Sequence, residues 1–380
     1  MPLVYSKKKV VLNRFLEVFA WLFFWPRLLV LHIRPNKDRE NTKYILLVEP
    51  FGIGDILSLS VMLDPLLSAF PHAEILLLTK KGNEDVYAQD PRISRVYTAS
   101  FPWSKLSGQK GGTVKEWVGV FKTCRVISRL RPDIGLDTRS EIRSQILMVL
   151  CNCRCRVGFT NYLNTNINVK GRLLTERVDK SGHLHRYDMN RLLLASGLNL
   201  KLDPMHFPSF KPELIPERLI NGGTEVLFHV GARWRYRQWP VGQWAELGRR
   251  LRMIGIEPYV IGSVFEEDLL NQISNQTGLP NVLADMERLI RLVRGCNVLV
   301  CLDSGPMHLA QTLGIPVVAL FGPGDFDLWH PRGMRDRVVF HRLSCNPCLQ
   351  KQCERPNDGC MEKISVDEVY EQVMEVLKYG

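Results

Sequence analysis

Short apolar runs alternate with longer helical patterns along almost the whole chain, and this alternation is the strongest constraint on the fold. The first run, residues 44–48, is aliphatic and too short for a buried helix, which is typical of a buried strand. A helical pattern at residues 56–70 follows it. Strands that alternate with helices predict parallel βαβ units, and therefore an α/β fold with doubly wound sheets. The other predicted strands are 74–79, 93–97, 134–137, 156–159, 226–230, 258–261, 297–301 and 317–321, and the other predicted helices are 114–130, 141–150, 186–196, 240–253, 266–277, 286–295 and 366–379.

The chain has 380 residues, a length that suggests two domains. A polar, proline-containing stretch separates two halves with the same strand and helix pattern. Two such halves predict Rossmann-like domains that face a central cleft, with ligands at the carboxyl ends of both sheets. The expected parts are a leader at 1–43, a first domain at 44–205, a linker at 206–221, a second domain at 222–365 and a final helix at 366–380.

The leader is basic and contains an apolar segment at residues 15–33. Its longest uncharged part, residues 18–26, is too short to span about 30 Å of hydrocarbon, and large residues follow where a signal-peptide cleavage site needs small ones. The favoured interpretation is a helix that lies in the membrane interface, and the alternatives are a true span or a helix packed on the protein body. Nine Lys and Arg residues against three acids in residues 1–43 suit an anionic membrane surface. No helix carries a basic reading face, which argues against nucleic acid.

Residues 297–312 predict a strand, a polar turn and the start of a helix. Asp303 or Ser304 suits the N-cap position, Gly305 permits close approach of a ligand, and Pro306 suits the first helical turn. Such a helix start directs backbone N–H groups at an anion such as a pyrophosphate. An ordinary capped turn is the alternative interpretation.

Gly52, Ile53, Gly54 and Asp55 follow the first predicted strand. The third glycine of a dinucleotide-binding fingerprint is absent, which argues against a nicotinamide site. Asp55 lies at the start of a helix, where a carboxylate either stabilises the helix terminus or acts as a general base.

A basic loop follows the strand at residues 226–230 and includes Gly231, Arg233, Arg235 and Arg237. It is either a solvated loop or an anion site, because guanidinium groups match phosphate oxygens in pairs. Arg237 is the favoured phosphate ligand, and Arg233 or Arg235 could assist it.

Together these motifs resemble glycosyltransferase family 9, the bacterial heptosyltransferases. The resemblance covers residues 44–380 and rests on I-L-L-V-x-P-F-G-I-G-D-I-L at the first strand, the basic loop before Trp239 and Pro240, and D-S-G-P-x-H-x-A with the following strand. It implies a GT-B fold whose last helix returns to the first domain. It also implies inverting, metal-independent transfer of heptose from ADP-heptose to a lipid-linked lipopolysaccharide core acceptor at the cytoplasmic face of the inner membrane.

The resemblance also assigns roles to single residues. Asp55 corresponds to the catalytic base and Arg237 to the residue that holds the donor phosphates. Glu266 corresponds to a ribose-binding acid and Met286 to a residue beside the base, although Glu266 also fits a plain helix start. Glu49 stands where the family usually has Arg. The remaining assignments are Gly54, Gly231, Asp303, Ser304, Gly305 and His308 for the donor, where His308 also fits a structural histidine, and Gly52 and Ile53 for the acceptor.

Four cysteines before the last helix have the spacing of metal ligands: Cys345, Cys348, Cys353 and Cys360. A structural zinc site, disulfides and free thiols all fit this spacing, and the resemblance requires no cofactor for catalysis. Asp325 and Asp327 form a D-x-D sequence, which we interpret as a chance match rather than a metal site.

Two other functions fit the same residues. A family member could transfer a different sugar to another surface glycan, or a catalytically inactive protein could keep the binding cleft and dock on the membrane. The first would differ in its donor specificity, and the second would lack turnover.

Overall fold

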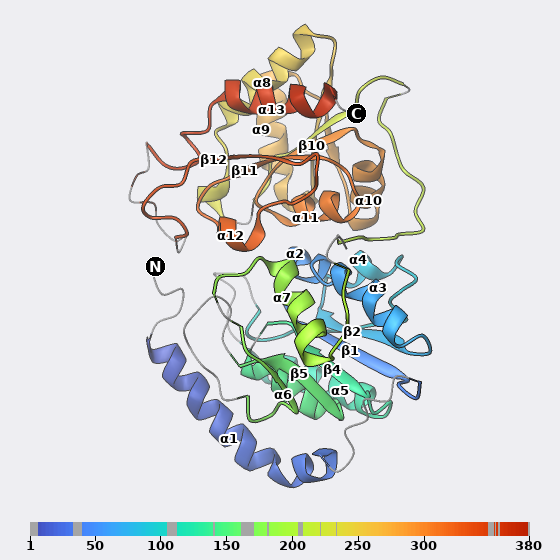
Figure 1. Cartoon of the computed structure of the whole chain (residues 1–380). Coiled ribbons are helices and arrows are strands. Elements are labelled where there is room, and N and C mark those ends of the chain that lie inside the picture. Colours follow the sequence, from blue (N-terminus) through green and yellow to red (C-terminus); the bar gives the residue numbers. More distant parts are fainter. Residues whose placement is uncertain are drawn as a thin grey trace. The chain divides into compact units, whose positions relative to one another are not determined.

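The computed structural model describes residues 7–32, 40–104, 112–139, 141–160, 171–180, 182–203, 208–220, 222–232, 234–348, 353, 355 and 358–378. It divides into two compact units between Pro208 and Ser209. This boundary lies inside the expected linker, residues 206–221. Each unit consists of a parallel sheet with helices on its faces (Figure 1), which confirms the predicted α/β class.

The first unit contains a six-stranded parallel sheet in the order β3-β2-β1-β4-β5-β6. Interior residues of β1, β2 and β4 are fully buried, which explains their continuous apolar sequences, because helices cover both faces of a parallel sheet. The strands are β1 (Tyr44–Glu49), β2 (Glu74–Lys80), β3 (Arg95–Ala99), β4 (Ile134–Asp137), β5 (Cys155–Phe159) and β6 (Glu176–Val178). The helices are α1 (Lys7–His32), α2 (Ile53–Leu57), α3 (Ser60–Ala69), α4 (Glu84–Tyr87), α5 (Val114–Ser128), α6 (Ile142–Leu150), α7 (Arg186–Leu192) and the π-helical turn η1 (Leu193–Gly197).

The second unit repeats this architecture in the order β12-β11-β10-β7-β8-β9. Its core joins the central strands to Trp239, Trp244 and the apolar face of the last helix. The strands are β7 (Val226–His229), β8 (Pro258–Gly262), β9 (Asn281–Leu283), β10 (Val298–Leu302), β11 (Val317–Phe321) and β12 (Arg337–Phe340). The helices are α8 (Val241–Met253), α9 (Glu267–Thr277), α10 (Met286–Gly295), α11 (Gly305–Thr312), α12 (Phe326–Trp329) and α13 (Val366–Lys378), with the 3₁₀ turns η2 (Arg235–Arg237) and η3 (Val264–Glu266).

Each sheet reverses its strand order at one pair of neighbouring strands. In the first sheet the pair is β1 and β4, and in the second it is β7 and β10. Ligands of open α/β sheets bind beyond the carboxyl ends of the strands at this reversal. The ends of β1, β4, β7 and β10 are therefore the places where functional side chains are expected.

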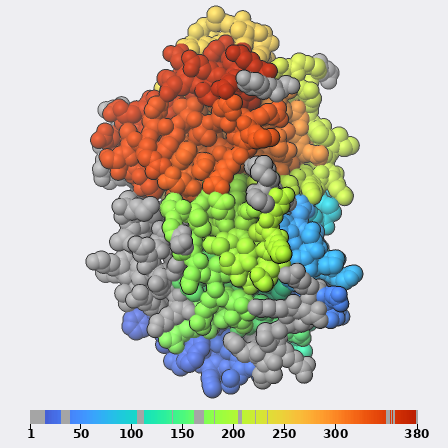
Figure 2. Space-filling model, in the orientation of Figure 1, coloured from blue at the N-terminus to red at the C-terminus, as the bar shows by residue number. Residues whose placement is uncertain are grey.

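The last helix corrects one prediction. Helix α13 packs on β10, β11, β12 and α8, all in the second unit, instead of returning to the first domain. Its apolar stripe, with Val369, Val373 and Val376, is buried in the second core, which gives the helix a complete packing surface there. In Figure 2 the red C-terminal residues lie against the orange residues of the same unit.

Helix α1 has two different faces. Glu17, Ala20 and Leu28 are buried, and α1 packs on α6, where Ala20 and Leu28 meet Ile142 and Val149. The other face exposes its large apolar side chains, which are Phe15, Leu16, Val18, Phe19, Leu22, Phe23, Trp25, Leu29 and Val30. The helix continues through Pro26. No described helix is long and apolar enough to cross a membrane.

Other differences from the predicted elements are local. The expected helix at 56–70 is two helices, α2 and α3, because the chain turns at Ser58, whose hydroxyl donates to the carbonyl oxygen of Asp55 at 2.6 Å. Three short strands were not predicted: β6, β9 and β12. Most residues of β6, β9 and β12 are only partly buried, so their sequences lack a continuous apolar run.

Candidate active site

A buried ion pair lies at the carboxyl end of β1. Glu49, the last residue of β1, accepts a hydrogen bond from Arg186 at 2.7 Å, and neither side chain is exposed. The Thr138 hydroxyl donates to the same carboxylate oxygen at 2.7 Å. Arg186 is the first residue of α7 and also donates to the Ser58 hydroxyl at 3.3 Å. The pair therefore ties α7 to the ends of β1 and β4.

Asp55 lies beside this pair, in the first turn of α2. One carboxylate oxygen accepts a hydrogen bond from the Gly52 backbone N–H at 3.1 Å, and the other accepts one from Arg139. The side chain keeps 17% of its exposure, so solvent reaches it. A carboxylate has about four acceptor positions, so the carboxylate can accept a further hydrogen bond from a hydroxyl group. Its geometry is that of a positioned proton acceptor.

Arg139 links Asp55 to Glu49. It follows β4, its Nε lies 4.0 Å from a Glu49 carboxylate oxygen, and its guanidinium group lies over the Phe51 ring at 4.2 Å from the centroid. Arg139 was not among the residues predicted from the sequence. The position just after a strand at the sheet reversal was the signal that could have found it.

Burial changes the charge state of two acids in this region. It raises the pKa of Glu49 to about 7, and the nearby Asp55 adds to the shift. Burial likewise raises the pKa of Asp137, the last residue of β4, to about 7, and the nearby Glu141 and Glu49 add to it. Both side chains are fully buried. A raised pKa means that the folded chain binds protons that the unfolded chain has already released.

The replacement Asp137→Asn is expected to flatten the pH dependence of stability. In the parent chain the free energy of unfolding should fall as the pH rises from about 4 to about 7, by at most about 1.4 kcal/mol per pH unit for this group. Asn cannot ionise, so the part of this fall that comes from Asp137 should disappear. The part that comes from Glu49 should remain. Thermal unfolding at several pH values measures the effect. The exposed Asp85→Asn is the matched control, and parallel profiles for parent and Asp137→Asn would contradict the protonated state.

In the second unit, Arg237 and Asp303 pair at the ends of β7 and β10. One Arg237 nitrogen donates to the Asp303 carbonyl oxygen at 2.8 Å and lies 2.9 Å from its carboxylate. Asp303 is buried, whereas the Arg237 side chain is 21% exposed. A methyl group on Gly324 would come within 2.0 Å of the Asp303 carboxylate, so the loop after β11 packs tightly here. The pair holds a partly exposed guanidinium group at the sheet reversal.

The start of α11 lies directly after Asp303. Ser304 is the N-cap residue by backbone conformation, but its side chain makes no capping hydrogen bond and instead donates to the Leu302 carbonyl oxygen at 3.2 Å. Ser304 therefore takes the N-cap position that the sequence predicted, without a side-chain cap. Ser304 and Gly305 are partly exposed. Uncapped N–H groups at a helix start, next to a guanidinium group, are suited to an anionic oxygen.

Glu266 lies close to Gly231. A methyl group on Gly231 would come within 1.5 Å of a Glu266 carboxylate oxygen, so only glycine fits beside it. The Ser263 backbone N–H and hydroxyl donate to the other oxygen at 2.9 and 2.8 Å. His229 Nε2 lies 3.9 Å from Glu266, and burial lowers the pKa of His229. The capping role that the sequence allowed for Glu266 is present, and one carboxylate oxygen is directed toward the end of β7.

Comparison with known proteins relates these two sites to a family. The sequence pattern described as glycosyltransferase family 9 (heptosyltransferase) matches residues 120–357, more than half of the chain. The chain belongs to glycosyltransferase family 9.

Individual relatives agree with this family. The chain is 24% identical over 328 residues to lipopolysaccharide heptosyltransferase 1 of Pseudomonas aeruginosa. This match covers 81% of the chain and 87% of that protein. It is 36% identical over 84 residues to lipooligosaccharide heptosyltransferase 2 of Campylobacter jejuni, which covers only 22% of the chain and 26% of that relative. The solved structure of E. coli heptosyltransferase WaaC with ADP-2-deoxy-2-fluoro heptose matches with a TM-score of 0.69 and 17% identity, and covers 87% of the chain and 99% of that structure. This likeness shows the GT-B fold.

The family 9 pattern includes Arg237, Glu266 and Asp303 but begins after Asp55. The role assigned to Asp55 is therefore supported by its position in the first unit and not by the family pattern. The other predicted site residues have the following surroundings. The start of α2 holds Gly52, Ile53 and Gly54, which are partly buried. Met286, the first residue of α10, is also partly buried. His308 is buried in α11, and its ring centroid lies 5.2 Å from that of Trp329. Arg233 lies outside the described residues.

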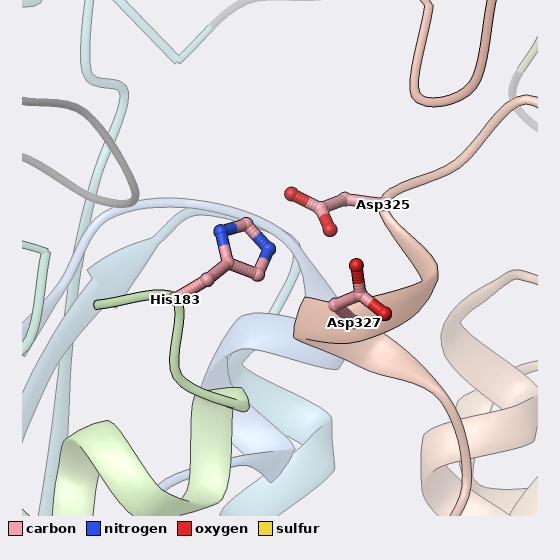
Figure 3. Close-up of side chains that lie close together, drawn as sticks. All are labelled: His183, Asp325 and Asp327. Atoms are coloured by element: carbon pink, nitrogen blue, oxygen red, sulfur yellow. The ribbon is translucent and has the colours of Figure 1, made fainter. Parts of the chain in front are cut away.

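The D-x-D residues of this family 9 chain have structural partners in their own unit. Asp325 is the N-cap of α12 and accepts a hydrogen bond from the Leu328 N–H at 3.2 Å. Asp327 accepts one from Arg342 at 2.7 Å. Figure 3 shows both carboxylates at the start of α12. A cap and a surface ion pair account for the two acids.

The four-cysteine cluster differs from a zinc site. Among the described residues, no three of the sulfur atoms of Cys345, Cys348, Cys353 and Cys360 lie within 4.8 Å of one another. All four are free thiols, with Cys345 exposed and Cys360 buried. Cys360 packs beneath Gly322, where an added methyl group would lie 3.2 Å from its sulfur atom. Of the three interpretations that the spacing allowed, the structure has free thiols.

Proposed function

We propose that the chain is an inverting glycosyltransferase that transfers heptose from ADP-heptose to a lipid-linked lipopolysaccharide core acceptor, without a catalytic metal. Membership of family 9 and the likeness to lipopolysaccharide heptosyltransferases support the reaction class. The observation that carries the proposal is the partly exposed Arg237 next to the uncapped start of α11. These groups offer what a nucleoside diphosphate leaving group needs, because its negative charge grows as the bond breaks.

In the proposed reaction, Asp55 accepts the proton of the acceptor hydroxyl. The hydroxyl oxygen then attacks the anomeric carbon of the donor, and the bond from that carbon to the diphosphate breaks with its electron pair on the diphosphate. Arg237 and the N–H groups of α11 stabilise the departing charge, while Asp303 orients Arg237. We assign Glu266 and Met286 to the ribose and base of the donor, and Gly52 and Ile53 to the acceptor.

A donor panel tests this proposal. The purified chain is incubated with a core acceptor that lacks heptose and with ADP-heptose or other nucleotide diphosphate sugars, and products are identified by mass spectrometry and by the anomeric configuration of the new bond. Product from ADP-heptose with inverted configuration, unchanged by a chelator, is the expected result. Product from another donor alone would indicate a family member with a different sugar. Nucleotide binding without product would indicate an inactive binding protein.

Replacement of Arg237 by Ala is expected to lower kcat by roughly 10²–10³, the usual loss when one donor to a developing oxyanion is removed. Arg237→Lys should lose less, because it keeps the charge but not the paired N–H groups. Steady-state kinetics with ADP-heptose measure both. The control is Arg249→Ala, which removes an exposed arginine that pairs with Glu246 on α8. Equal kcat in Arg237→Ala and Arg249→Ala would exclude Arg237 from the site.

We also propose that the chain works at the cytoplasmic face of the inner membrane and binds it peripherally through residues 15–33. The exposed apolar face of α1 supports this proposal, together with the basic character of residues 1–43. A lipid-linked acceptor is presented at such a surface, so docking would place the first unit beside its substrate.

A further inference from the structure

Helix α5 presents a second apolar face to solvent. Val114, Trp117, Val118 and Phe121 are exposed at helical spacings of three and four residues, so they share one face. The adjoining face is also apolar, because Val120, Cys124 and Ile127 are buried in the first core. A surface helix normally directs polar residues outward. Trp117 keeps one contact inside the first unit, since its ring centroid lies 5.5 Å from that of Trp103. Val114, Val118 and Phe121 remain exposed.

Cations accompany the apolar residues on α5. Its exposed charged residues are Lys115, Lys122, Arg125 and, just beyond the helix, Arg129. The acid of the helix, Glu116, forms the N-terminal capping box with Thr113. Aromatic and aliphatic side chains among cations are the pattern of a helix that lies in the interface of an anionic bilayer. A protein partner with a purely apolar surface would leave these cations without counter-charges.

Helices α5 and α1 both cover α6. Each of them packs on α6, whose residues 142–150 include no exposed position. Asn152, just after α6, joins the two: Arg27 of α1 donates to its side-chain oxygen at 2.6 Å, and its amide donates to the Ser128 carbonyl oxygen of α5 at 3.3 Å. The shared partner Asn152 therefore places the end of α5 next to α1.

We propose that the outward faces of α1 and α5 form one docking surface for an anionic lipid bilayer. The inference rests on the peripheral membrane association proposed above for α1 and adds α5 to it. One helix alone leaves the unit free to rotate about that helix. A second helix with its own apolar and basic side chains fixes the orientation of the first unit on the membrane.

Vesicle binding by the full chain tests this surface. The vesicles contain phosphatidylcholine alone or with phosphatidylglycerol, and three double variants are compared with the parent chain. The first, Trp117→Gln with Phe121→Gln, changes α5, and the second, Phe19→Gln with Phe23→Gln, changes α1. The control, Phe265→Gln with Met334→Gln, changes two exposed apolar residues of the second unit. The α5 variant is expected to bind anionic vesicles about tenfold or more weakly, since two large apolar side chains no longer leave water.

A second measurement does not depend on any variant. Hydrogen exchange of the parent chain should slow in α5 as well as in α1 when anionic vesicles are added. Parent-like binding by the α5 variant, without protection of α5, overturns this inference and leaves the α1 anchor in place. Absence of vesicle binding by the parent chain overturns the membrane association itself. A monomer–dimer change in the α5 variant during sedimentation, with unchanged vesicle binding, would show that a second copy covers the stripe and would also overturn the inference.

Discussion

Replacement of Asp55 by Asn is expected to reduce sugar transfer by roughly 10³-fold or more while donor affinity changes little. Asn keeps the size and the hydrogen bond from the Gly52 N–H, but an amide oxygen cannot take a proton from the acceptor hydroxyl at neutral pH. General base catalysis contributes about 10²–10⁴ in rate. The diphosphate ligands proposed here belong to the other unit, so calorimetric titration with ADP should give the parent dissociation constant.

Two further variants make this test specific. Glu84→Gln changes an acid in the first turn of another helix of the same unit, where the carboxylate accepts a hydrogen bond from the Gly82 N–H. It should retain parent activity. Asp55→Glu keeps the carboxylate but moves it, so activity between the parent and Asp55→Asn is expected. If Asp55→Asn turns over like Glu84→Gln, another group takes the proton.

Replacement of Arg186 by Met is expected to destabilise the chain by roughly 3 kcal/mol or more. Glu49 would lose its ion-pair partner at a site with no solvent exposure, and the hydrogen bond from Arg186 to the Thr138 carbonyl oxygen at 2.5 Å would also be lost. Glu49 can respond by binding a proton, since burial already raises its pKa to about 7. The loss should therefore be smaller at low pH than at pH 8. Denaturant unfolding at both pH values measures it.

A double-mutant cycle separates the lost pair from the lost packing. Glu49→Gln combined with Arg186→Met removes both charges and should recover part of the stability lost in Arg186→Met, because no buried charge remains without its partner. Arg191→Met is the control on the same helix, where Arg191 donates to the exposed Asp203 carbonyl oxygen. An equal loss in Arg186→Met and in the double variant at pH 8 would show that Glu49 without its partner costs no stability.

Burial patterns explain which elements could be predicted. The predicted strands include β1, β10 and β11, which are short aliphatic runs buried on both faces. The edge strands β9 and β12 were missed because at most one of their residues is buried, so they carry no such run. Helix α13 was predicted from its apolar stripe, but a stripe does not state which surface covers it, and the second core does.

The residues of the candidate site also fall into those that the sequence could predict and those that it could not. Gly231, Arg237 and Asp303 could be found because each follows a predicted strand, and strand ends meet at one edge of a parallel sheet. The Arg186 partner of Glu49 lies 137 residues away along the chain, and no spacing rule connects them. The spacing of the four cysteines left zinc, disulfides and free thiols open, and among the described residues no three of them form a ligand group.

Residue order was sufficient to locate the buried strands, most helices and the residues beside the strand ends, because burial on a sheet and the backbone at a helix terminus select residue types locally. It could not identify the partners of Glu49, Asp55 and Arg237, the unit that binds α13, or the two faces of α1. These depend on distances between segments far apart in the chain. Coulomb attraction, hydrogen bonding and apolar contact are strong only between groups that are close in space. Only the folded chain brings these segments close together.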